Sequence, residues 1–75
     1  MGTAPGQAEL RKRLARAVRR ERLRLGLTQE ETAERAGIAT RQLQRIEAAG
    51  VNAGLSTLAG LCRAFRVDVV RLFEN

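Results

Sequence analysis

The chain has 75 residues, of which 44% are hydrophobic, and 14 lysines and arginines against eight acidic residues give it a net charge of +6. This length allows one small domain, and the bias toward arginine favours a partner with phosphate groups, since the planar guanidinium binds phosphate through two hydrogen bonds. One cysteine and no histidine exclude an internal disulfide and leave too few ligands for a zinc site. The composition therefore predicts no metal and no cofactor.

The hydropathy pattern gives no sign of a membrane segment or an export signal. No apolar run approaches the roughly 20 residues of a membrane span. The first residues lack the apolar core of a signal peptide. We therefore expect a cytoplasmic protein without membrane contacts.

The N-terminal third combines a short polar stretch with a basic helix. Residues 1–8, MGTAPGQA, have nothing to bury, and we interpret them as a flexible tail before a single domain at residues 9–75. From Glu9 to Leu25 the apolar residues return at spacings of three, four or seven, which predicts an amphipathic helix that Gly26 ends. The apolar positions are Leu10, Leu14, Ala17, Val18 and Leu25.

Two short helices are expected next in the chain. Thr28 and Glu31 form a capping-box pattern, so a helix should begin at Gln29 and end at Gly37. After a turn of a few residues, a further helix should occupy residues 40–49 and end at Gly50.

The C-terminal part predicts a fourth helix at residues 55–65 and one last helical turn. The apolar face of the fourth helix consists of Leu55, Leu58, Leu61, Cys62 and Phe65. We expect Cys62 to fill the core there, with redox sensing as the alternative. Asp68 suits the N-cap of a turn at residues 69–73, in which Val69, Leu72 and Phe73 would close the core. No segment alternates like a strand, so the sequence predicts an all-α fold, a compact five-helix bundle.

The helices at residues 29–36 and 40–49 have the spacing of a helix-turn-helix, in which the second helix enters the major groove of DNA. Winding at about 100° per residue turns Leu43 and Ile46 inward. The outward positions are Arg41, Gln44, Arg45 and Ala48, with Thr40 and Gln42 on the flanks. Arginine can pair with guanine and glutamine with adenine, while a small alanine keeps the helix slim. This face therefore predicts contacts to base edges.

The sequence resembles the Cro and phage-repressor type of helix-turn-helix domain, also called XRE-like. The resemblance rests on RLRLGLTQEETAERAGIATRQLQRIE, on Asn52 and on LSTLAGLCRAFRVDVVRLF, and it covers about residues 14–73 without a gap. It implies a fold like that of the lambda repressor. It also implies base contacts from Thr40, Arg41, Gln44 and Arg45, and phosphate contacts from Gln29, Gln42 and Asn52. By the same resemblance, Arg22 and Glu47 should form a partly buried salt bridge between the first and third helices.

Some positions depart from the family pattern. Ala39 stands where members often have Ser or Thr, so the third helix should lack its usual cap or use Thr40. The segment EAAGVNAG lacks the common Arg-Gly and Pro, which leaves the path of this loop open. Arg66 stands where a glycine is frequent, and we expect it to adopt a left-handed backbone at some energetic cost.

The leading functional hypothesis is a sequence-specific DNA-binding transcriptional regulator, a repressor or an autoregulating controller, that works as a homodimer. The alternative is an antitoxin-like or protein-interaction module, which would bind a toxin or another protein through apolar residues at the C-terminal end. That surface would use Val67, Val70, Phe73 or Leu55. A membrane-surface role for the basic first helix is disfavoured, because its apolar stripe is needed for the core. An enzyme is disfavoured too, because the chain offers no pair of base and nucleophile.

Overall fold

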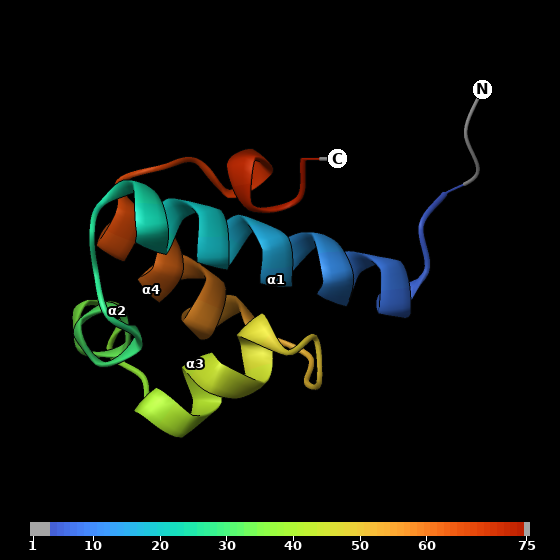
Figure 1. Ribbon diagram of the computed structural model, residues 1–75. Helices are drawn as coiled ribbons and strands as arrows, with labels where there is room; N and C mark the ends of the chain where they lie inside the picture. The colour runs from blue at the N-terminus through green and yellow to red at the C-terminus, as the bar shows by residue number, and fades with distance from the viewer. Residues whose placement is uncertain (1–3, 75) are drawn as a thin grey trace.

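The computed structural model describes residues 4–74 and consists of four α-helices followed by a short 3₁₀-helix (Figure 1). The elements are α1 (Gln7–Arg24), α2 (Gln29–Ala36), α3 (Thr40–Glu47), α4 (Leu55–Phe65) and the 3₁₀-helix η1 (Val69–Leu72). Residues 4–74 contain no strand, so the all-α prediction is confirmed. The fifth predicted helix is a 3₁₀-helix of four residues rather than an α-helix.

Two helix boundaries differ from the prediction. Helix α1 begins at Gln7 rather than Glu9, because the Leu10 amide already bonds to the Gly6 carbonyl at 3.0 Å. The end of the predicted tail is therefore helical, while residues 1–3 of that tail lie outside the described part of the chain. Helix α3 ends at Glu47 rather than at residue 49, because Ala49 has a left-handed backbone with φ of +58°.

One core joins all five elements. Its most completely buried large side chains include Val18, Leu43, Ile46, Leu61, Phe65 and Leu72, one or two from each of α1, α3, α4 and η1. In α2 the buried side chains are small, and this lets the helix lie close to its neighbours. The predicted apolar faces hold with three exceptions: Leu25, Leu55 and Val69 are 38%, 84% and 44% exposed, so none of them closes the core.

Helices α2 and α4 approach each other closely at Gly60. A Cβ atom at this position would lie 2.2 Å from the backbone oxygen of Ala36, the last residue of α2. Only glycine permits this contact. Gly60 therefore sets the distance between α4 and the end of α2 that leads into α3.

The helix ends follow the predicted local chemistry. The capping box is present: the Glu31 amide donates to Thr28 Oγ1 at 3.0 Å, and the Thr28 amide donates to Glu31 Oε1 at 2.9 Å. Hydrogen bonds from the Thr28 backbone and side chain to the carboxylate lower the pKa of Glu31. Arg66 is left-handed with φ of +56°, as expected, and Ala39 caps α3 with no side-chain hydrogen bond.

A buried carboxylate holds η1 against α1. The side chain of Glu21 is fully buried and accepts hydrogen bonds from Arg20 and Arg24, while Arg71 of η1 lies 3.3 Å away. Burial alone would raise the pKa of Glu21, but the hydrogen bonds and charges of these arginines outweigh it and lower the pKa. Glu21 was not predicted to be buried.

Candidate nucleic-acid interface

Helix α3 lies at one edge of the molecule, on the opposite side of α1 from η1 (Figure 1). Leu43 and Ile46 are at most 1% exposed and hold this short helix to the core. On its outer side Arg41, Gln44 and Arg45 are exposed, while Thr40 and Gln42 are half-buried on the flanks. The exposed α3 side chains are therefore two guanidinium groups and an amide, with no carboxylate among them.

A two-point ion pair fixes the end of α3 to α1. Arg22 Nε donates to Glu47 Oε2 at 2.7 Å, and Arg22 Nη2 donates to Glu47 Oε1 at 3.1 Å. The two side chains are only 14% and 8% exposed. The hydrogen bond to Glu47 raises the pKa of Arg22, so the guanidinium stays charged. The predicted Arg22–Glu47 bridge is present, and it fixes the orientation of α3.

Gln29, the first residue of α2, lies between α2 and the outer side of α3. Its Nε2 donates to Glu47 Oε1 and its Oε1 accepts from Gln44 Nε2, both at 3.4 Å. The side chain is half-buried, so part of its amide can still meet a ligand. The position agrees with a residue that steadies α3 and lies beside any molecule bound to it.

Gln42 is held more firmly than the sequence suggests. Its Nε2 donates to Oγ1 of Thr57, a buried residue of α4, at 3.1 Å. One of the two amide N–H groups is therefore used inside the protein, which leaves one for a phosphate.

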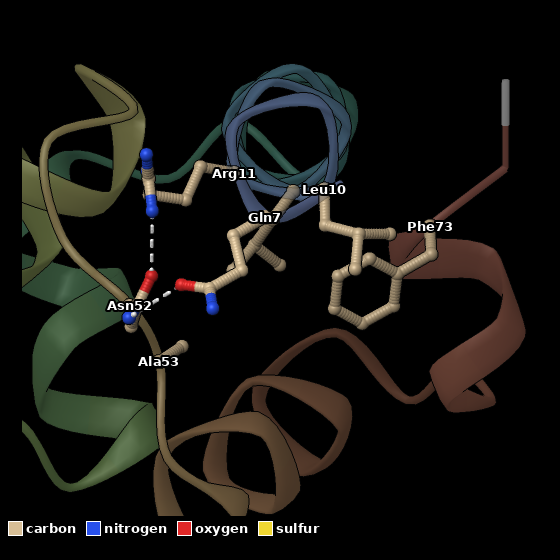
Figure 2. Close-up of a pocket in the computed structure, with 7 residues that line it drawn as sticks. Gln7, Leu10, Arg11, Asn52, Ala53 and Phe73 are labelled. Carbon is tan, nitrogen blue, oxygen red and sulfur yellow. Dashed lines mark hydrogen bonds between the residues drawn. The ribbon is translucent and has the colours of Figure 1, made fainter. Parts of the chain in front are cut away.

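Asn52, in the loop between α3 and α4, bonds to the start of α1. Figure 2 shows its Oδ1 accepting from Arg11 Nη1 at 2.8 Å and its Nδ2 donating to Gln7 Oε1 at 3.3 Å. Sequence reasoning did not find these partners, which lie 41 and 45 residues away from Asn52 in the chain. The contacts give the loop a defined path although it lacks the family's usual residues.

A shallow groove runs between the outer side of α3 and this loop. It is lined by Ala39, Arg41, Gln42, Arg45, Val51 and Asn52. Arg41 and Arg45 therefore make this groove basic, and its positive charge could attract a polyanion.

The helix-turn-helix family model matches residues 18–72, from the middle of α1 to the end of η1. The chain belongs to this family. Members of the Cro and phage-repressor type regulate transcription by binding DNA, and this function applies to the chain. The predicted fold and family are thereby confirmed.

Solved structures of bacterial regulators have the same fold. The hypothetical transcription factor NHTF from Neisseria is 27% identical, with a TM-score of 0.83 over 99% of this chain and 85% of its own. The clp gene regulator ClgR from C. glutamicum is 28% identical, with a TM-score of 0.77 over 92% and 86%. The restriction-modification controller protein C.AhdI from Aeromonas hydrophila is 24% identical, with a TM-score of 0.80 over 84% and 96%, and shows the shared fold alone.

A search of curated protein sequences finds no significant match to the chain. The family and the structural neighbours are regulators of transcription rather than enzymes. No helix within residues 4–74 is long and apolar enough to cross a membrane.

Proposed function

We propose that this regulator reads an operator by placing α3 in the major groove, with Arg41, Gln44 and Arg45 facing base edges and Thr40 beside them. The observation that carries the proposal is the outer side of α3, where these polar side chains are exposed over a buried Leu43 and Ile46. An α-helix with its side chains is about 10–12 Å across, so it fits the major groove, which is about 12 Å wide.

The phosphate contacts in this proposal lie on both sides of α3. Gln29 meets the strand beside α2, while Gln42 and Asn52 lie on the side of the following loop. The hydrogen bonds from the half-buried Gln29 amide to Gln44 and Glu47 support this role, because they hold the side chain beside α3. Such contacts position the protein on any duplex, whereas the α3 contacts distinguish one sequence from another.

We further propose that the protein acts as a homodimer on a two-fold operator and represses by occupying it. Each good bidentate base contact discriminates by about 1–3 kcal/mol, so one copy falls short of the roughly 4–10 kcal/mol of a specific regulator. Val69 and Val70 of η1 are 44% and 65% exposed, and an apolar surface of this kind suits a second copy. Non-enzymatic action in the cytoplasm belongs to the same proposal.

Selection of bound duplexes from a random DNA pool tests this proposal. The selected site should be two-fold symmetric, with guanine or adenine at the positions that α3 reaches. Affinity for this site and for mixed-sequence duplex should both fall steeply as salt rises, and the selected site should stay the tighter ligand. A pool that yields no preferred sequence would contradict direct reading by α3.

The same exposed valines, together with Leu55, favour a second candidate function in which the fold binds another protein. A chain used only in this way would bind mixed-sequence duplex weakly and without a steep salt dependence. The salt titration therefore separates the two functions.

A further inference from the structure

The first half of α1 lies outside the segment that matches the family. The match begins at residue 18, whereas α1 begins at Gln7. This additional part of the helix contains Gln7 and Arg11, the two residues that bond to Asn52. The loop after α3 is thus supported by a segment that the family pattern does not include.

Arg11 and Arg22 lie on the same side of α1. They are 11 residues apart, which is about three helical turns. Arg22 reaches the end of α3 through Glu47, and Arg11 reaches the following loop through Asn52. The chain leaving α3 therefore runs along this side of α1, and Arg11 stands next to it.

Asn52 separates two hollows in the surface. On one side is the groove that contains Arg41 and Arg45 of α3. On the other side is a pocket that is lined by Arg11 together with Leu10 and Phe73 (Figure 2). Arg11 therefore lies next to Asn52, just outside the groove that contains Arg41 and Arg45.

The charge of Arg11 is not neutralised by its partner. Asn52 is uncharged, and no carboxylate lies within ion-pair distance of Arg11 in the described part of the chain. Arg13 and Arg16, by contrast, pair with Glu9. A guanidinium has five N–H donors, so the bond from Nη1 to Asn52 leaves most of them for an anion.

We propose that Arg11 binds a backbone phosphate of the DNA strand that passes over the α3–α4 loop, and that Asn52 positions its guanidinium. The inference rests on the proposed function, because α3 in the major groove brings a phosphate strand over this loop. Asn52 then contributes by orienting Arg11 as well as by its own amide. A charged donor that is already held in place loses little conformational freedom when it binds phosphate.

Salt titrations of Arg11→Gln and Arg16→Gln test the assignment. Both variants remove one positive charge from α1, but Arg16 lies about 140° around the helix from Arg11. Arg11→Gln should weaken binding to every duplex alike and reduce the slope of log affinity against log salt by about 0.9 per bound protomer. Between 50 and 200 mM salt, the ratio of wild-type to variant affinity should shrink about 3.5-fold. Arg16→Gln should leave the slope unchanged, and Arg11→Lys should retain it.

The role of Asn52 is tested in a double-mutant cycle. In an Asn52→Ala background, Arg11→Gln should cost less affinity than in the wild type, because the guanidinium is no longer held. Equal slopes for Arg11→Gln and Arg16→Gln would overturn the proposal. So would an Arg11→Gln variant with lower thermal stability and an unchanged slope, since Arg11 would then only support the loop. A wild-type chain that binds no duplex would instead refute the proposed function itself.

Discussion

Replacing Gly60 by alanine should destabilise the whole domain. The added Cβ would lie 2.2 Å from the Ala36 oxygen and 3.1 Å from its carbonyl carbon, and both are backbone atoms that cannot rotate away. Ordinary contact therefore requires α2 and α4 to separate by about 1 Å, and overpacking of this kind costs about 1–3 kcal/mol. Because Ala36 leads directly into the turn before α3, the displacement should also move the DNA-reading helix.

Thermal unfolding followed by circular dichroism measures the effect, with Gly50→Ala as the matched control. A Cβ at Gly50 meets only the Arg45 oxygen at 3.6 Å, an ordinary contact, and the change in the unfolded chain is the same. In a domain of this size each kcal/mol lowers Tm by roughly 4–8 °C, so a 2 kcal/mol loss should lower Tm by roughly 8–16 °C. If Gly60→Ala melts at the same temperature as Gly50→Ala, the close approach of α2 and α4 is wrong.

Three further changes test the helix ends and the two buried ion pairs. Ala49→Gly should stabilise the fold by about 1 kcal/mol in urea unfolding, because glycine adopts a φ of +58° without strain; no gain would mean that Ala49 is not left-handed. Glu47→Ala leaves the guanidinium of Arg22 without its carboxylate partner and should lower the free energy of unfolding in urea by roughly 3–5 kcal/mol. A loss below about 1 kcal/mol would mean that the pair contributes no more than a surface salt bridge. The pKa of Glu21 in the folded state is lowered below its ordinary value of 4.5. The contribution of Glu21 to the free energy of unfolding is therefore full above pH 4.5 and is lost as the pH falls through the pKa of the folded state. Urea unfolding of the wild type and of Glu21→Gln should therefore differ most near pH 7 and converge in acid, and a constant difference would contradict this pKa.

Local sequence signals predicted the centre of the fold. The capping box at Thr28 and the glycine at position 37 define both ends of α2, and the helix has these bounds in the structure. The helical wheel separated Leu43 and Ile46 from the outer side of α3, because a short helix needs only two buried anchors. These features depend on residues three or four apart, and such spacings can be read from sequence.

Features that depend on distant residues could not be predicted in this way. Alanine favours helix, so nothing in the sequence marks Ala49 as the left-handed residue that stops α3 at Glu47. A glutamate among many arginines is expected in solvent, and the burial of Glu21 depends on Arg71, which is 50 residues away. Residues 48–54 contain no motif that would pair Asn52 with Arg11, and this contact required the tertiary structure.

The central claim is that the outer side chains of α3 read base edges, and the binding of Arg41→Ala tests it most directly. Its affinity should be measured on the selected operator and on duplexes in which each base pair in turn is replaced by the other three. The variant should lose about 1–3 kcal/mol of discrimination between base pairs at one position per half-site, and it should keep the wild-type base preference at the other positions. Gln29→Ala, as a phosphate-contact control, should weaken binding to all these duplexes about equally. An Arg41→Ala variant that loses the same affinity on every duplex would contradict direct reading by α3.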